Sequence, residues 1–465
     1  MTLLGYLLVT TLAWGVLAFG AVYAWAYAPL GVAAAGLGLW AIVKTRAWRD
    51  RRARVLMYAL AAVAIAIAFQ IVPLPYDWFV RMSPSADRLL RQLELGYALQ
   101  PPGWHALSAR PDATAVFLAM FVAYSLLLIG LMRAVTFLRL EWLLTQFMAF
   151  GVALALFGII QNAVMAKDDF LVYGFWRPLA TATPFGPFIN RNHFAGLMLL
   201  LIPLVAGYAG AVATMSRQPR DRSLATWLTW FISPDASRFA FASFAVVAMA
   251  AAVIASGSRS GMASFAVALA VFGCLAARRA SRRDARVAIF MYVTVLLVGA
   301  LGWMGMEAVV ERFRLAGTDL QDRVAAWRDT VAIIRDFPLA GTGFGAYGAA
   351  MLTYQTANRT SIFIHAHNEY LQILAEGGAL VAIPAAVAAG VIIRGIYRRL
   401  ARGEDDVMTG WVRLGAIAGL AGIAAQSLLE FSLQMPGNAA VCVLLIAIAL
   451  HRPRRVVAER DAHRV

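Results

Sequence analysis

Long apolar stretches separated by polar connections make up most of the chain. A helix needs about 20 apolar residues to cross the hydrocarbon core of a bilayer, and twelve stretches approach or exceed this length. They cover residues 3–26, 28–43, 54–73, 113–132, 137–162, 193–214, 239–256, 260–277, 287–306, 375–397, 411–430 and 437–451. The pattern therefore predicts an all-α membrane protein with about twelve transmembrane helices, of which the short stretches 260–277 and 437–451 are the least typical.

The polar segments between these stretches define the predicted organisation. Residues 1–306 hold helices one to nine, with two long connections at 73–114 and 161–192. Residues 307–374 form the largest connection, 375–451 hold the last three helices, and 452–465 are a basic tail. Connections of this length are more often functional than merely connective. We expect 73–114 to be an Ω-like loop or a short amphipathic helix.

The largest connection has internal structure in its pattern. Helical periodicity runs from Ala308 through Arg335, and glycines at every second position of Gly341–Gly345 then require a turn. Helical spacing resumes from Asn368, and Gly377-Gly378 predicts a break before the next apolar stretch.

Composition and charge place the protein in lipid. The chain is 61% hydrophobic and 14% charged, with a mean hydropathy of +0.70. Its net charge of +16 does not indicate nucleic acid, because the basic residues gather in short alternate connections such as 44–54 and 278–283. By the positive-inside rule both termini are expected in the cytoplasm. The connections that hold Arg191, Arg259 and His367 would then face the other side, which is the periplasm in a bacterium.

Two histidines in the largest connection are candidates for chemistry. His367 falls on the helical face of Leu371 and Leu374, which would place an imidazole at the edge of an apolar surface. Ordinary hydrogen-bonding histidines are the simpler interpretation. Extended backbone would place His365 and His367 on one face, but a third ligand is lacking nearby in the sequence, so no metal site is predicted. A carboxylate that orients His367 would come from Glu369, Asp322 or Glu430.

Arginines near the same side of the predicted membrane are the second set of candidates. Arg259 lies in a tight connection, Arg191 at the start of a span, and Arg323 on the predicted loop helix. An arginine at membrane depth is costly, and its planar fork suits phosphate oxygens. Backbone N–H groups at the starts of two spans could add to an anion site. Snorkelling or ion pairing is the simpler alternative.

The ordered motifs resemble the bacterial O-antigen ligase/polymerase family of membrane glycosyltransferases. The matching pieces are Gly186-x-Phe188-x-Asn190-x-Asn192-His193-Phe194-Ala195, Ser258-Arg259-Ser-Gly261, Asp322-Arg-x-x-x-Trp327, Phe337-Pro-Leu-x-Gly341-x-Gly343-x-Gly345, and His367-Asn-x-x-Leu371 with Glu376-x-Gly378. The first 150 residues contribute little to this resemblance. It implies a GT-C-type membrane glycosyltransferase architecture with a large helical periplasmic loop.

The resemblance also implies the activity and its residues. The family moves a glycan from undecaprenyl diphosphate to an acceptor hydroxyl at the periplasmic face of the inner membrane, with inversion and without a metal or other cofactor. The catalytic histidine would be His367. Arg259, Arg323 and Arg191 would hold the diphosphate, and His365, Asn368, Glu376 and Asn192 would assist.

The acceptor is left open by the resemblance. A polymerase in O-antigen, capsule or exopolysaccharide synthesis is favoured, because the Val72-Pro-Leu-Pro75 segment looks like that of exopolysaccharide members. A ligase to lipid A–core in lipopolysaccharide synthesis, or to protein, is the alternative, and a chain-length regulator would be a further partner. A lipid flippase is less consistent with the sequence, since no internal repeat is visible.

Overall fold

The computed structural model describes residues 2–165, 171–178, 182–216, 232–279, 316–356, 362–403 and 405–452. Within these residues, nine helices are long and apolar enough to cross a membrane. They are α2 (Ala24–Thr45), α3 (Arg51–Ile71), α7 with its 3-10 extension (Pro111–Phe137), α8 (Leu140–Val164), α9 (Arg191–Met215), α11 (Pro234–Ser256), α12 (Arg259–Arg279), α17 (Glu369–Leu400) and α18 (Val407–Gln426). Two shorter apolar helices, α1 (Thr2–Leu17) and α19 (Pro436–Leu450), join them. The all-α, multi-pass membrane fold is thus confirmed.

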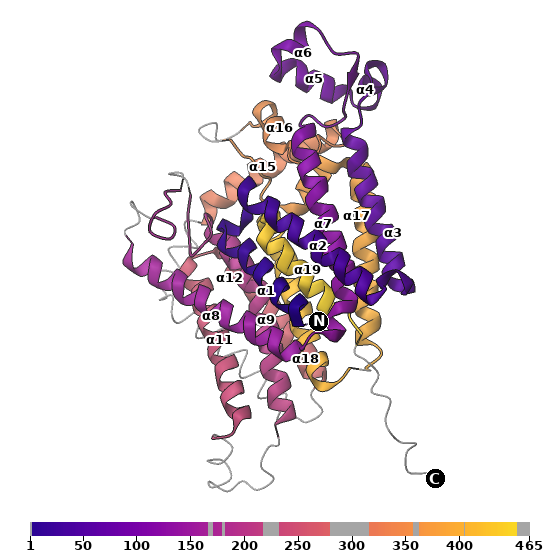
Figure 1. The fold of residues 1–465 in the computed structure, drawn as a ribbon. Helices are drawn as coiled ribbons and strands as arrows, with labels where there is room; N and C mark the ends of the chain where they lie inside the picture. The colour runs from indigo at the N-terminus through magenta and orange to yellow at the C-terminus, as the bar shows by residue number, and fades with distance from the viewer. Residues whose placement is uncertain are drawn as a thin grey trace.

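The bundle is organised around α9, which is almost completely buried and lies between α8 and α18 in Figure 1. α9 packs along α18 and α11, and α12 packs on both α9 and α18. Glycines permit this contact, because a Cβ added to Gly207 would lie 2.5 Å from a backbone oxygen of α18, and one on Gly415 would lie 2.2 Å from a backbone oxygen of α9. Small residues let membrane helices approach to backbone contact. The buried apolar core therefore continues through α9 and its neighbours.

Eleven of the twelve predicted spans overlap a helix, and the twelfth, 287–306, lies outside the described residues. The first prediction was wrong in its limits: α1 ends at Leu17 and α2 begins at Ala24, not at residue 28. Phe19, Gly20 and Ala21 all have positive φ, so the chain turns there. The predicted span 411–430 is also misplaced, because α18 ends at Gln426 and leaves Glu430 in the following turn.

The connection at 73–114 is more ordered than a loop. It forms α4 (Tyr76–Met82), α5 (Pro84–Leu93), α6 (Leu95–Leu99) and a short ribbon in which β1 (Leu74–Pro75) pairs antiparallel with β2 (Trp104–His105). These helices lie over one end of the bundle (Figure 1). They share a buried apolar cluster with α15 (Ala316–Asp336) and α16 (Tyr347–Tyr354). Within the predicted connection 307–374, residues 307–315 lie outside the described part of the chain, as does 453–465 of the tail.

α17 begins at Glu369, six residues before the predicted boundary, and kinks at Gly378. Gly378 has φ 54° and ψ −166°, which only glycine adopts readily. The kink exposes backbone groups that the glycine-rich turn satisfies: Thr342 N donates to Ala375 O, and Ala379 N donates to Pro338 O, both at 2.9 Å. The expected break at Gly377-Gly378 is confirmed, and it attaches the turn to the start of α17.

We expect the substitution Gly378→Ala to destabilise this junction. The added Cβ would lie 2.5 Å from Gly341 N and Leu339 O, in a backbone conformation that costs about 1–3 kcal/mol for other residues. Thermal unfolding in detergent should show a lower midpoint than wild type. Gly390→Ala on the same helix is the control, because a Cβ at Gly390 meets nothing within 4 Å. Equal midpoints for the two variants would contradict this account of the kink.

Candidate active site

A buried carboxylate, Glu430, is the centre of the candidate site. It lies in the turn between α18 and α19, and its side chain is 0% exposed. Its Oε1 accepts hydrogen bonds from Arg323 Nη2 at 2.5 Å and Asn192 Nδ2 at 2.6 Å. A buried charge costs several kcal/mol unless it is paired and hydrogen-bonded, and these donors supply that pairing. The carboxylate thus joins α15 and the start of α9.

His367 faces the other oxygen of the same carboxylate. Its Nδ1 lies 3.4 Å from Glu430 Oε2, an ion-pair distance that lacks the angles of a hydrogen bond. The imidazole is 26% exposed, whereas Glu430 is inaccessible. A carboxylate beside one ring nitrogen favours the proton on that nitrogen. We therefore infer that the proton resides on Nδ1, which leaves the Nε2 lone pair available to a ligand.

The electrostatics of Glu430 support an ionised carboxylate. Burial alone would raise its pKa, but the neighbouring His367 and Arg323 lower it by more, so the pKa of Glu430 lies below its ordinary value of 4.5. The carboxylate is then charged at neutral pH. A fixed negative charge stabilises a neighbouring imidazolium, which is what a histidine becomes when it accepts a proton.

The backbone around His367 is held in a specific conformation. His367 has φ +49°, in the left-handed region that few residues with side chains occupy. Ala366, just before it, is fixed on both sides: its carbonyl accepts from Trp327 Nε1 at 3.0 Å, and its N–H donates to Gln372 Oε1 at 3.0 Å. After it, Asn368 caps the first turn of α17 with its side-chain oxygen. The imidazole is therefore placed by packing from both α15 and α17.

We expect Trp327→Phe to loosen this placement without unfolding the protein. The substitution keeps an aromatic ring and removes one hydrogen bond, worth about 1 kcal/mol. Turnover should fall several-fold, while the unfolding midpoint changes little. Rates of product formation and thermal unfolding would be measured on the same purified sample. A variant that matches wild type in turnover would show that the bond to Ala366 does not position His367.

Phe431 gathers three histidines around one ring. His365 stacks on it with ring centroids 4.1 Å apart, whereas His367 and His193 approach it edge-on at 5.0 and 4.7 Å. His365 Nδ1 also lies 3.2 Å from Gln372 Nε2. Burial, with smaller effects of His193 and His367, lowers the pKa of His365 to about 3. Such a weakly basic imidazole is poorly matched to proton abstraction near neutral pH, which favours His367 over His365 as a base.

The starts of α9 and α12 meet beside Glu430. Asn192 Oδ1 accepts a hydrogen bond from Ser258 Oγ at 2.7 Å, and Ser258 Oγ also accepts from the backbone N–H of Gly261. Arg191 and Arg259 are the first residues of these two helices. Helix N-termini attract anions through their unpaired N–H groups and the helix dipole. The structure thus brings both predicted arginines, through their neighbours, to the side of the site that holds Arg323.

Arg323 makes two hydrogen bonds within the protein that the sequence did not predict. Besides Glu430, it donates from Nη1 to the carbonyl of Leu429 at 2.8 Å. A guanidinium has five N–H donors, so these two bonds leave three. Arg323 can fix the Glu430 turn and still present donors to an anion.

Glu376 lies beyond Gln372, on the side of His365. Its Oε1 accepts from the backbone N–H groups of Gly345 and Tyr347 at 2.9 and 3.0 Å, which caps the start of α16. Its Oε2 lies 3.5 Å from Gln372 Nε2, the group that also contacts His365. Glu376 therefore holds the glycine-rich turn in place, and Gln372 links it to His365.

The three carboxylates predicted as possible partners of His367 differ in their position relative to it. Glu430 faces it. Glu369 points elsewhere, accepting from the backbone N–H of Leu433 at 3.1 Å. The side chain of Asp322 lies outside the described residues. No group of three or more His, Cys, Asp or Glu side chains that could hold a metal is found in the described parts of the chain.

Sequence reasoning missed the roles of Gln372, Phe431 and Ser258. Ser258 was inside a recognised motif, and Phe431 follows Glu430 directly, but neither position had a periodicity or spacing that indicated contact with His367 or Asn192. The site joins segments that are far apart in the sequence: Asn192 and Glu430, which share a hydrogen bond, are 238 residues apart.

In a comparison with protein families, residues 244–386 match the family described as O-Antigen ligase. The matched range contains Arg259, Arg323, His365 and His367, whereas Asn192 and Glu430 lie outside it. Comparison with curated proteins gives no match.

Proposed function

We infer from the match of residues 244–386 that this chain belongs to the O-antigen ligase/polymerase family and functions in surface polysaccharide synthesis. We propose that it moves a glycan from undecaprenyl diphosphate to an acceptor hydroxyl. One observation supports this most strongly. His367, which lies in the matched range, faces the buried, ionised carboxylate of Glu430, which Arg323 also contacts, beside the N-termini of two membrane helices. This combination supports the proposal that His367 is a base beside a site suited to a multiply charged anion.

In the proposed reaction, the acceptor oxygen attacks the anomeric carbon of the donor sugar. The new carbon–oxygen bond forms as the bond between that carbon and the diphosphate oxygen breaks, and the electron pair leaves with the lipid diphosphate. His367 Nε2 takes the hydroxyl proton, and Glu430 stabilises the imidazolium that results. Attack from the side opposite the leaving group inverts the anomeric configuration.

The leaving group needs its negative charge balanced for this reaction. Arg259, Arg191 and the remaining N–H donors of Arg323 are proposed to bind the diphosphate oxygens, with help from the starts of α9 and α12. Preorganised donors aimed at a developing charge are commonly worth several kcal/mol to the transition state. On this proposal the arginines perform the charge neutralisation that a divalent cation performs in other transferases.

The proposed setting is the inner membrane of a bacterium, with both termini in the cytoplasm and His367 facing the periplasm. This follows from the basic connections of the sequence. As acceptor we favour the glycan of a second lipid-linked repeat unit, which makes the protein a polymerase. Transfer to lipid A–core or to protein is the alternative.

The test uses purified protein in lipid vesicles, supplied with undecaprenyl-diphosphate-linked repeat units alone, with products separated on a gel. A ladder of lengthening chains is expected for a polymerase. Product that forms only after lipid A–core or a protein acceptor is added would identify a ligase. Absence of product with every acceptor, while lipid-linked sugar crosses the bilayer, would show that the protein is a transporter.

A further inference from the structure

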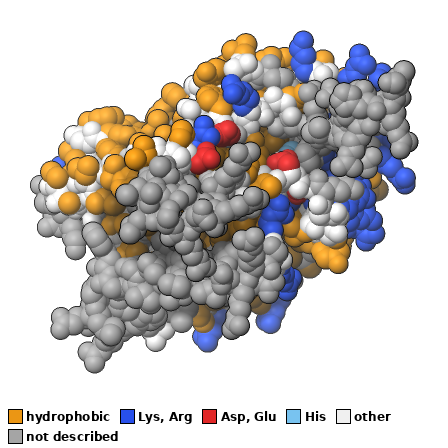
Figure 2. Space-filling model, turned by 90° about the horizontal axis from the view of Figure 1, so that it is seen from below, with side chains coloured by type: hydrophobic (Ala, Val, Ile, Leu, Met, Phe, Trp, Pro, Cys, Tyr) orange, Lys and Arg blue, Asp and Glu red, His pale blue; other side chains and the backbone are white. Residues whose placement is uncertain are grey.

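A second polar feature lies at the opposite end of the molecule from His367. α17 starts beside His367 and is 32 residues long, so its two ends are roughly 45 Å apart. Its far end lines a cavity of about 880 Å³ with the start of α3 and the ends of α7 and α19. The end of the bundle seen in Figure 2 shows many blue Lys and Arg side chains and few red acidic ones.

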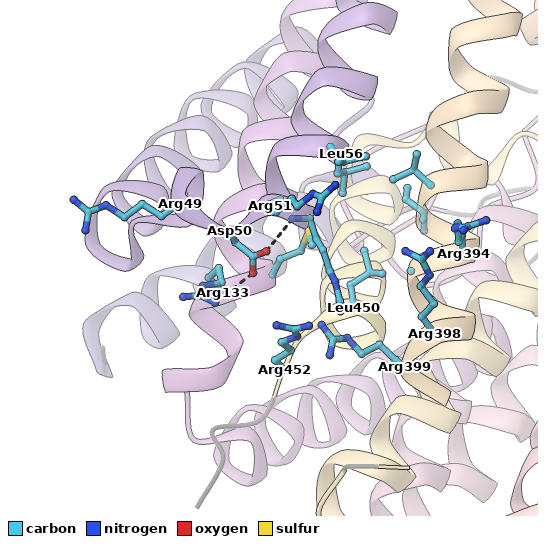
Figure 3. Close-up of a pocket in the computed structure, with 17 residues that line it drawn as sticks. Arg49, Asp50, Arg51, Leu56, Arg133, Arg394, Arg398, Arg399, Leu450 and Arg452 are labelled. Atoms are coloured by element: carbon cyan, nitrogen blue, oxygen red, sulfur yellow. Dashed lines mark hydrogen bonds and ion pairs between the residues drawn. The ribbon is translucent and has the colours of Figure 1, made fainter. Parts of the chain in front are cut away.

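Eight arginines line this cavity. Arg394, Arg398 and Arg399 come from the last turns of α17. Arg51 and Arg52 come from the start of α3, and Arg49 from the turn just before it. Arg133 and Arg452 complete the set. Figure 3 shows the guanidinium group of Arg399 beside that of Arg452.

One carboxylate, Asp50, faces these arginines among the described residues that line the cavity. It is already engaged, because it accepts from the backbone N–H of Arg52 at 2.9 Å and pairs with Arg133 at 3.3 Å. The neighbouring carboxylate Asp405 is occupied by Arg413, which bonds both of its oxygens at 2.8 Å. Among the described residues that line the cavity, eight arginines thus face one carboxylate, and like charges this close repel one another.

The rest of the cavity wall is apolar and opens beside the outer surface of the bundle. Leu56, Met132 and Ile392 line it, as does Val55, which is 48% exposed. Ile393, the next residue after Ile392, is 66% exposed. The cavity thus combines a cationic end with an apolar wall that is continuous with the surface that a membrane would cover.

We propose that this cavity binds a phosphate-bearing anion, supplied as the headgroup of an anionic membrane lipid. Arginine forks match phosphate oxygens, and basic pockets between membrane helices are known to bind such headgroups. The apolar wall accounts for the choice of a lipid over a soluble phosphate compound, because an acyl chain would cover Val55 and Ile392. This site is separate from the proposed donor site, and its occupancy does not depend on the proposed reaction.

The experiment titrates the purified full-length protein in neutral detergent with cardiolipin, with phosphatidylcholine and with inorganic pyrophosphate, and counts bound molecules by native mass spectrometry. The test variant is Arg398→Gln/Arg399→Gln. The control variant, Arg139→Gln/Arg238→Gln, removes two charges from arginines that do not line the cavity. Wild type and control should bind cardiolipin in preference to phosphatidylcholine, and the test variant should bind it at least tenfold more weakly.

The outcomes separate the two sources of phosphate. Cardiolipin binding that pyrophosphate does not match supports the lipid headgroup. Equal binding of pyrophosphate would overturn the lipid assignment, because pyrophosphate has no acyl chain to contact the apolar wall. Equal cardiolipin affinity in both variants would overturn the site itself. Because the test substitutions relieve repulsion, the lipid-free variant should unfold at or above the wild-type temperature, which distinguishes loss of binding from loss of folding.

Discussion

Replacement of His367 by alanine is expected to lower the rate of glycan transfer by about 10²- to 10⁴-fold, the usual contribution of a general base. The substitution removes the imidazole and leaves Glu430 bound to Arg323 and Asn192. Donor binding should persist, because the proposed phosphate ligands are arginines. The measurement is product formation from a saturating lipid-linked donor, with donor affinity determined on the same sample.

His365→Ala is the matched comparison for this variant. His365 contacts the same Phe431 ring, but burial lowers its pKa to about 3 and makes it a poor base. We expect His365→Ala to retain far more activity than His367→Ala. The reverse order would reassign the base to His365, and normal turnover by His367→Ala would exclude a catalytic role for His367.

Substitution of Glu430 by glutamine should lower turnover nearly as much as His367→Ala does, and it should destabilise the fold more than His367→Ala does. The amide cannot stabilise an imidazolium at His367, and it leaves the Arg323 charge without its partner. Breaking a buried ion pair costs about 3–5 kcal/mol, and we expect the lower end because Arg323 is 21% exposed. Turnover and chemical unfolding of Glu430→Gln would be compared with those of wild type.

Glu369→Gln is the control for this substitution. Glu369 is also buried in the same region, but it bonds the backbone of Leu433 and does not face His367. Its variant should keep the transfer reaction even if its stability changes. A Glu430→Gln protein that turns over as fast as the Glu369→Gln protein would refute the role of Glu430 as the partner of His367.

Glu430 also predicts a pH dependence of stability. Its pKa is lower in the folded protein than its ordinary value of 4.5. The stabilisation from its ionised form is therefore fully present above pH 4.5 and is lost as the pH falls through the lower folded-state pKa. On acidification below pH 4.5, the unfolding midpoint of wild type should drop more steeply than that of Glu430→Gln. Parallel curves for the two proteins would contradict the lowered pKa.

The fold was largely predictable because membrane helices are marked by long apolar stretches. The failures have local causes. The first turn contains a single glycine, Gly20, and its apolar neighbours Phe19 and Ala21 also adopt positive φ, so the apolar pattern continued through the turn and did not mark it. The connection at 73–114 folds because its helices bury side chains such as Phe79 and Leu90 against α15 and α16, a tertiary contact that periodicity alone does not reveal.

The site was predictable in its parts but not in its connections. His367, Arg323 and Asn192 could be chosen from their motifs, whereas their meeting at Glu430 depends on packing between distant helices. The sequence left Glu430 as one of three candidates, and the apolar stretch 411–430 even assigned it to a membrane span. Only the end of α18 at Gln426 places its carboxylate in the turn that faces His367.

The most direct test of the central proposal is chemical rescue of the variant His367→Gly. Glycine accommodates the φ of +49° at this position, so the backbone should persist while a space the size of an imidazole opens beside Glu430. Transfer by this variant would be measured with increasing concentrations of imidazole. The account predicts a very low rate that rises and saturates as imidazole fills the space. A rate that equals wild type without imidazole, or that imidazole leaves unchanged, would contradict His367 as the base.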